Sequence, residues 1–282
     1  MDSQKQVVHF QALRTFSDGQ SDEQQRRWSE EAWENANRNG RIDRSRVNLN
    51  FEIVKGGHIQ SVDTTKSIYE KFQENIRSRG IADPNKGSEE LHFRTVVDFV
   101  ISGSHDTLHR LAWGDQQIDL SEGADNSKLV RHEGIELWAK DMYDVLCREY
   151  GEDNIISFIV HMDERSPHIH ADVIPVTKDN RISFSKVFCG RNKYEFSQRS
   201  LRLHDIFAEA NAKWGLERGD AVAVTHRKHR STEEYRRELS GQCSTLEKEL
   251  DNKTATLEDL NRQIRLAETR VKGLRTMVAN LE

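Results

Sequence analysis

The chain has 282 residues and a formal net charge of −5 at pH 7; hydrophobic residues make up 35% and charged residues 32%. At a mean hydropathy of −0.80, a single compact globule that uses the whole length is not expected, so part of the chain should be solvated. No window approaches the about 18 apolar residues of a membrane span, the N-terminus lacks the order of a signal peptide, and the three cysteines form no C-x-x-C pair. We therefore expect a cytoplasmic protein with no membrane partner.

Helices and strands alternate along most of the chain. Apolar residues that recur every three or four positions, with glycine just after each segment, predict helices. These helices cover residues 20–38, 61–79, 135–150 and 196–214. Short segments of alternating or continuous apolar residues predict strands. These strands cover residues 47–53, 93–101, 155–160 and 169–176. We expect the turn-rich residues 103–128 to form an insertion, and the whole to be an α+β sandwich with a largely antiparallel central sheet flanked by helices.

The last part of the chain carries a regular apolar stripe. From Leu239 to Leu281, steps of four and three residues meet an apolar side chain or cysteine at every position except Lys253. Such a stripe needs a partner, so we expect a C-terminal coiled-coil helix that joins two copies into a parallel homodimer. The alternative is a long amphipathic helix that folds back on its own body. The pattern reaches Glu282 without a breaker, so a natural chain that continues further is admissible. We predict two domains, 1–232 and 233–282.

The charge is unevenly distributed. Residues 181–237 hold 13 Lys or Arg against 7 Asp or Glu, although the whole chain is acidic. A polyanion would therefore bind this segment rather than the average surface.

Three histidines lie close together in the segment after residue 160. His168 and His170 are two apart on a predicted strand and so share a face, while the alternation of the preceding strand puts His161 on the same side. The six-residue connection containing Pro167 allows the two strands to pair antiparallel. Three imidazoles from two strands are typical of a catalytic metal site with positions left for water or substrate. Without a thiolate, Zn²⁺, Mn²⁺, Ni²⁺ and Mg²⁺ are all admissible.

Two motifs resemble those of a known family. The first is the stretch His161-x-Asp163-Glu164-x-x-Pro167-His168-x-His170, followed by Pro175. The second is the stretch Asp43-Arg44-Ser45-Arg46-Val47-Asn48-Leu49-Asn50-Phe51-Glu52. Both are similar to motifs of the MobV (Mob/Pre) relaxases, mobilisation proteins of the HUH endonuclease superfamily. The resemblance covers roughly residues 5–237.

The resemblance implies a fold, an activity and a cofactor. The fold would be the HUH-type sandwich, and the activity would be nicking of one strand at a transfer origin by metal-assisted transesterification, which leaves the enzyme attached to the 5′ end. The metal would be Mn²⁺ or Mg²⁺, with Zn²⁺ or Ni²⁺ as alternatives, held by His161, His168 and His170. Glu164 is similar to the family's acidic residue that orients or deprotonates the nucleophile. Partners would be the origin DNA, as a single strand or hairpin, and other transfer proteins.

The family's usual nucleophile is missing. Between Phe10 and Gly57 the chain has neither His nor Tyr, and Gln24-Gln25-Arg26-Arg27-Trp28 stands where the family carries its His-x-x-Arg-like motif. We rank Tyr69 ahead of His9 and His58 as the nucleophile, because its helix follows the second motif.

Several basic and polar residues are predicted DNA contacts. They are Arg27, Arg44, Arg46, Asn48, Lys186, Arg191, Lys193, Arg227, Lys228 and Arg230. Two other functions stay open. One is an origin-binding protein that keeps the metal site but does not nick DNA. The other is a metal-dependent hydrolase of small substrates, which would not need the basic segment or the coiled coil.

Overall fold

The computed structural model describes residues 4–38, 42–119, 121, 123–219 and 232–280. The chain divides into two units, residues 1–219 and 220–282. The first is an α+β unit, and the described part of the second is one long helix, α8 (Thr232–Ala279). The boundary predicted between residues 232 and 233 stays a prediction.

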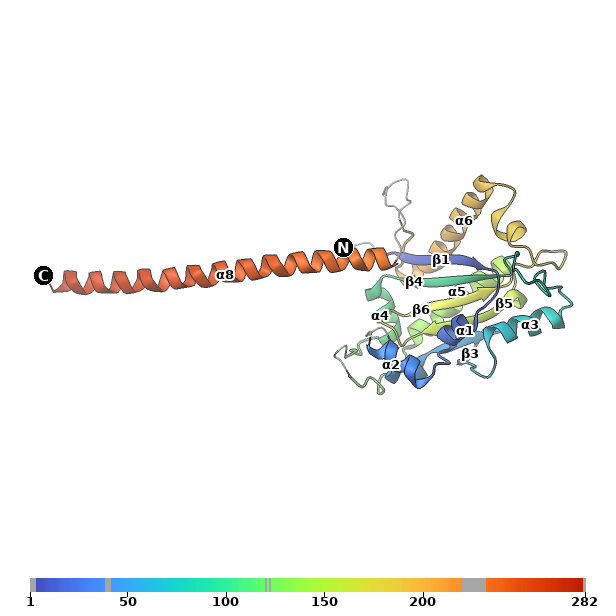
Figure 1. Ribbon diagram of the computed structural model, residues 1–282, viewed down its shortest axis with the longest axis horizontal. Coiled ribbons are helices and arrows are strands. Elements are labelled where there is room, and N and C mark those ends of the chain that lie inside the picture. The colour runs from blue at the N-terminus through green and yellow to red at the C-terminus, as the bar shows by residue number, and fades with distance from the viewer. Residues whose placement is uncertain (1–3, 39–41, 120, 122, 220–231, 281–282) are drawn as a thin grey trace. The chain divides into compact units, whose positions relative to one another are not determined.

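One antiparallel sheet forms the centre of the first unit (Figure 1), with its six strands in the order β1-β4-β6-β5-β2-β3. The strands are β1 (Gln6–Leu13), β2 (Phe51–Val54), β3 (His58–Ser61), β4 (Val96–Gly103), β5 (Ile155–His161) and β6 (His168–Val173). Every neighbouring pair is antiparallel. The predicted fold class is therefore confirmed, and the β5-β6 hairpin lies in the middle of the sheet.

Helices cover both faces of the sheet. They are α1 (Asp18–Gln25), α2 (Glu30–Arg38), α3 (Ile68–Ser78), α4 (His105–Trp113), α5 (Glu133–Tyr150) and α6 (Lys193–Asn211). Short 3-10 or π segments cover Arg44–Leu49, Glu152–Asn154, Ser185–Cys189 and Ala212–Trp214. Helices α4, α5 and α6 pack against Phe99, Phe158 and Ala171 on one face. Helix α3 packs with Ile156 on the opposite face. Helix α1 also lies on that face, where its Gln24 carbonyl contacts His161.

The predicted single helix over 20–38 is wrong, because the chain turns at Arg26. This residue has φ 56° and ψ 36°, and its N–H bonds back to the carbonyls of Asp22 and Glu23, which ends α1. A left-handed residue closes a helix instead of continuing it. The side chain of Arg26 is held in the interior of the protein, which explains why a residue other than glycine adopts this conformation.

Two further predictions need correction. Residues 103–128 are not simply an insertion, because Leu108, Ala112 and Trp113 of α4 are buried in the main core. The strand predicted over 47–53 begins only at Phe51, because Arg44–Leu49 forms a 3-10 turn. The Asp43 carboxylate caps that turn by accepting the N–H of Ser45.

The C-terminal helix is continuous over its 48 residues. Leucines on its apolar stripe are exposed: Leu246, Leu257 and Leu274 are 63%, 60% and 63% exposed. No helix in the ranges given above is long and apolar enough to cross a membrane.

Candidate metal centre

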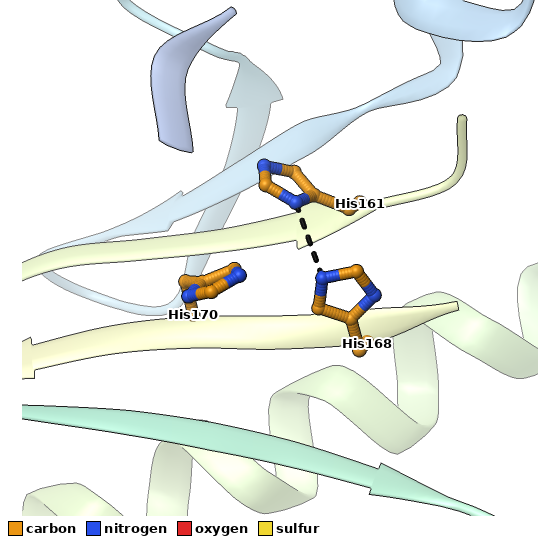
Figure 2. A group of neighbouring side chains, drawn as sticks. All are labelled: His161, His168 and His170. Atoms are coloured by element: carbon orange, nitrogen blue, oxygen red, sulfur yellow. Dashed lines mark hydrogen bonds between the residues drawn. The ribbon is translucent and has the colours of Figure 1, made fainter. Parts of the chain in front are cut away.

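The β5-β6 hairpin brings the three histidines together. His161 is the Cα partner of His168, and His170 is the partner of Ile159. Figure 2 shows the imidazoles converging from the two strands, with ring centroids 5.0 to 5.1 Å apart. The three rings therefore lie on one face of the sheet, as the strand alternation in the sequence predicts. One nitrogen from each ring lies within 4.8 Å of the others, a spacing that could hold a metal ion.

Backbone carbonyls fix the orientation of two of the rings. Nε2 of His161 lies 2.7 Å from the Gln24 carbonyl of α1, and Nδ1 of His168 lies 3.1 Å from the Ser166 carbonyl. A carbonyl can only accept, so each of these nitrogens carries the proton. The other two nitrogens, Nδ1 of His161 and Nε2 of His168, then face each other as lone pairs at 3.3 Å. Two lone pairs directed at a common point suit a cation, so this donor set fits a divalent metal.

Burial keeps these imidazoles neutral. Desolvation, reinforced by the Arg26 charge, lowers the pKa of His161 well below its usual value. Desolvation also lowers the pKa of His168, although the Glu164 carboxylate opposes the shift. Neutral imidazole is the form that binds a metal.

The third ring faces a buried carboxylate. Nδ1 of His170 lies 3.7 Å from Oδ1 of Asp98 on β4. Neither atom has a hydrogen-bond partner within the described part of the chain. A closer approach would let His170 donate to Asp98 and present Nε2 to the metal, the arrangement in which a carboxylate usually orients a ligand histidine.

Arg26 links the first helix to the histidine segment. Its Nε and Nη2 donate to both oxygens of Asp163 at 2.8 and 3.0 Å, and Nη2 also lies 2.7 Å from Oε1 of Glu164 and 3.2 Å from Nδ1 of His161. Arg26 is 7% exposed and Asp163 is fully buried. The sequence pattern favoured Arg27, whose Nε instead lies 3.7 Å from Asp22 at the surface. Two adjacent arginines carry no sequence signal that separates them, because the choice depends on the left-handed backbone at Arg26.

Glu164 lies beside the histidines, as the resemblance implied. Its Oε1 is 3.8 Å from Nδ1 of His161 and 3.9 Å from Nε2 of His168. Its carboxylate is about one-third exposed. It is therefore open to solvent or substrate while Arg26 fixes its position.

The second motif supports the loop that connects β5 and β6. The guanidinium of Arg46 is buried and donates to the carbonyl of Met162 at 2.6 Å and to Asp43 at 2.8 Å. The side-chain carbonyl of Asn50 accepts the N–H of Met162 at 2.6 Å. Arg46 is thus engaged inside the protein. Arg44 and Asn48 are exposed and line a groove of about 550 Å³ together with Arg26, Trp33, Ser45, Val47 and Ser127.

The remaining predicted residues lie elsewhere. Tyr69 is in the first turn of α3, 39% exposed, with its ring centroid 6.3 Å from that of Phe72. Lys186, Arg191 and Lys193 are exposed near the start of α6. Arg227, Lys228 and Arg230 lie outside the described residues.

A second buried carboxyl group lies behind His170. Asp172 on β6 is fully buried and is the Cα partner of Asp98. Burial, together with the nearby Asp98 charge, raises the pKa of Asp172 well above its usual value. The folded protein thus holds a proton that the unfolded chain releases above about pH 4, so stability falls as pH rises above that point.

We expect Asp172→Asn to remove this pH dependence. In metal-free protein, the free energy of unfolding of the variant minus that of the wild type should increase with pH above about pH 4, by up to about 1.4 kcal/mol per unit until the folded pKa is passed. Urea denaturation between about pH 5 and 8 measures this difference. A difference that does not change with pH would contradict the prediction.

Comparison with known proteins finds a family model that matches part of the chain, and solved structures with a similar fold. Residues 121–237 match the family model Mob_Pre, described as plasmid recombination enzyme. A plasmid recombination enzyme type 1 of Staphylococcus aureus is 38% identical over 106 residues, which are 38% of this chain and 25% of the relative. A plasmid recombination enzyme of Bacillus thuringiensis is 24% identical over 160 residues, 57% of this chain and 31% of the relative. The matched stretches thus span about a quarter to a third of these curated relatives.

Solved structures match most of the chain. The MobM relaxase domain (MOBV; Mob_Pre) bound to plasmid pMV158 oriT DNA, in Mn-bound crystal structures, is similar with TM-scores of 0.56 and 0.57 at 18% and 19% identity. The match covers 83% of this chain and 98% to 99% of the relaxase domain. At this identity the likeness shows a shared fold.

Proposed function

We propose that the chain is a member of the Mob/Pre family of plasmid recombination enzymes and acts as a relaxase, a metal-dependent enzyme that binds the transfer origin of a plasmid or mobilisable element and nicks one strand. The observation that carries the proposal is the group of three imidazoles, two of them held in the metal-binding tautomer by Gln24 and Ser166. Relatives bound to oriT DNA and Mn supply the class of substrate and make Mn²⁺ the first candidate metal.

The reaction would be a transesterification. A side-chain nucleophile forms a bond to the phosphorus, the bond from phosphorus to the 3′ oxygen breaks, and that oxygen leaves as a hydroxyl after it gains a proton. The chain stays attached to the 5′ phosphate, so the bond energy is kept for rejoining. A divalent ion held by His161, His168 and His170 would supply polarisation of the phosphate's non-bridging oxygens. We propose that Glu164, which lies 3.8 Å from His161 and 3.9 Å from His168, takes the proton of the nucleophile.

A side chain other than the family's usual histidine has to act as the nucleophile, because the chain has neither His nor Tyr between Phe10 and Gly57. We propose Tyr69 ahead of His9 and His58, since α3 lies on the same face of the sheet as the histidines and the phenol is partly exposed. A phenol oxygen forms a stable phosphodiester that can be reversed.

The groove beside Arg26 is our candidate path for the DNA strand. Arg44 and Asn48 lie at its surface, and Arg26 lies between the groove and His161. The Arg44 guanidinium is bound to Glu30 at 2.6 and 2.7 Å and lies over the Trp33 ring. A phosphate would have to replace Glu30 to bind Arg44.

The absent family histidine favours a second candidate, an origin-binding protein that does not cut. One experiment separates it from the relaxase and from a hydrolase of small substrates. Purified full chain with Mn²⁺ is incubated with single-stranded oligonucleotides that tile the element carrying its gene, and denaturing gels are scanned for covalent adducts. A relaxase gives an adduct, an origin-binding protein gives retention without an adduct, and a small-molecule hydrolase gives neither. The His168→Ala/His170→Ala variant is the control for metal dependence.

We propose that α8 joins two copies through its apolar stripe, and that the protein acts in the cytoplasm with other transfer proteins as further partners. We expect Leu260→Asp to convert the dimer to a monomer at micromolar concentration, because a charge would enter the coiled-coil core. Leu266→Asp is the matched control, since Leu266 is on the same helix but off the stripe; the two leucines are 49% and 63% exposed. Sedimentation measures the mass, and a wild-type chain that sediments as a monomer would contradict the prediction.

The basic segment should make DNA binding strongly dependent on salt. Each phosphate that a variant no longer neutralises should reduce the slope of log affinity against log salt by about 0.7 for single strands. The Arg227→Ala/Lys228→Ala/Arg230→Ala variant should therefore have a shallower slope than Arg202→Ala, whose arginine is already paired with Glu149 at 2.6 Å. Fluorescence anisotropy measures both, and equal slopes would argue against phosphate binding by these three residues.

A further inference from the structure

A pocket of about 470 Å³ lies on the opposite face of the sheet from the histidines. Phe10 of β1 contributes one wall and is the Cα partner of Phe99, which belongs to the core on that face. Val100 and Asp98, the partners of His170 and Asp172, point the other way because side chains alternate along β4. The pocket is thus separated from the metal centre by the sheet.

Flat aromatic rings form much of the pocket. Phe184 and Phe196 line it together with Phe10, and the rings of Phe10 and Phe196 meet edge to face at 6.5 Å. Phe196 is 38% exposed. Phe184 is fixed from behind, because its ring stacks on Phe188 at 5.3 Å with an interplanar angle of 16°. A rigid, partly exposed ring can stack on a flat ligand at little cost in side-chain entropy.

Three cations surround these rings. Arg94, Arg191 and Lys193 line the pocket, and the Arg94 guanidinium lies 5.4 Å from the Phe184 ring centroid. None of the three forms an ion pair within the part of the chain that the structure describes. On the same helix, by contrast, Arg199 lies 4.0 Å from Glu195 and Arg202 lies 2.6 Å from Glu149. The three cations at the pocket therefore carry positive charge without a paired carboxylate, whereas Arg199 and Arg202 nearby are paired with one.

We propose that this pocket binds an unpaired nucleotide of the DNA strand, with its base stacked on Phe196 and its phosphates on Arg94, Arg191 and Lys193. Aromatic rings with basic side chains are the combination that binds single strands without reading sequence. The ligand is single-stranded because the faces of paired bases are covered by their neighbours. The volume lies within the range of about 300 to 1,000 Å³ typical of small-ligand sites. The inference rests on the proposed function, since it takes the same DNA as ligand.

The test uses the full chain and fluorescein-labelled oligo-dT of 30 nucleotides. Phe196→Ala should weaken binding by about 5- to 150-fold, the effect of losing one stacked base. Tyr194→Ala is the matched control, because Tyr194 is an aromatic residue two positions away, 72% exposed and outside the pocket lining. It should change the affinity by less than about twofold. Equal affinities for the two variants would overturn the proposal.

A second variant and a cross-linking experiment test the pocket even if Phe196→Ala does not fold. Lys193→Gln should reduce the salt slope by about 0.7 with an unchanged melting temperature. Oligo-dT that carries 5-iodouracil should cross-link to a peptide containing Phe184 or Phe196, and cross-links confined to other peptides would overturn the pocket assignment. If the wild type does not bind oligo-dT at all, the pocket proposal fails, whereas the relaxase proposal is judged by adducts on the tiled oligonucleotides. If it binds and forms adducts while Phe196→Ala behaves as Tyr194→Ala, only the pocket fails.

Discussion

Replacing His168 and His170 with alanine should abolish Mn²⁺ binding by the chain. The double variant removes two of the three imidazoles that lie within 4.8 Å of one another. The fold should survive, because both side chains are partly exposed and neither belongs to the apolar core. Calorimetry measures the affinity, and circular dichroism checks the fold.

A matched control is available on α4. His105 and His109 have stacked rings 5.5 Å apart and lie outside the hairpin. The His105→Ala/His109→Ala variant removes the same number of imidazoles and should bind Mn²⁺ as the wild type does. Unchanged Mn²⁺ affinity in His168→Ala/His170→Ala, or an equal loss in the control, would show that the metal binds elsewhere.

Replacing Arg26 with methionine should be the most destabilising single change near the site. The variant leaves the fully buried Asp163 carboxylate without its two guanidinium bonds. Removing one partner of a buried ion pair typically costs about 3 to 5 kcal/mol, because the remaining charge is uncompensated. Methionine has the same unbranched stem as arginine, so the backbone strain at this left-handed position stays comparable. Denaturation in urea gives the free energy of unfolding.

Arg27→Met is the natural comparison. Arg27 is exposed, and surface changes of this kind usually alter stability by less than about 0.5 kcal/mol. Arg27 was also predicted to contact phosphate, so this variant should weaken DNA binding while leaving stability unchanged. Equal losses of stability in the two variants would mean that the Arg26–Asp163 pair does not hold α1 to the hairpin.

The metal centre could be predicted because its pattern is local. His161 is seven residues from His168, and the strand alternation with a short connection is enough to place both rings and His170 on one face. The sheet class followed for the same reason, since strand periodicity and hairpins are visible in a single sequence.

The surroundings of the site depend on contacts far apart in the chain. Arg26 bonds to Asp163, 137 positions away in the chain. The left-handed backbone at Arg26 directs its side chain toward Asp163, and no residue pattern in the sequence predicts that conformation. Asp98 did leave a signal, because a carboxylate inside the apolar run 96–101 has to face the polar side of the sheet. The sequence did not predict helix α4, because its apolar stripe is short and is surrounded by histidines and turn-forming residues. Tertiary packing of Leu108, Ala112 and Trp113 stabilises this helix.

The most direct test of the proposed mechanism is the intact mass of the full chain after incubation with Mn²⁺ and a single-stranded origin oligonucleotide. We predict a mass increase equal to the 3′-side DNA fragment with its 5′ phosphate less one water, together with a released 5′-side fragment ending in a 3′ hydroxyl. The increase should be absent without Mn²⁺ and in His168→Ala/His170→Ala. Cleaved DNA with free 5′ phosphates and a chain of unchanged mass would contradict the mechanism, because water rather than a side chain would then have attacked the phosphorus.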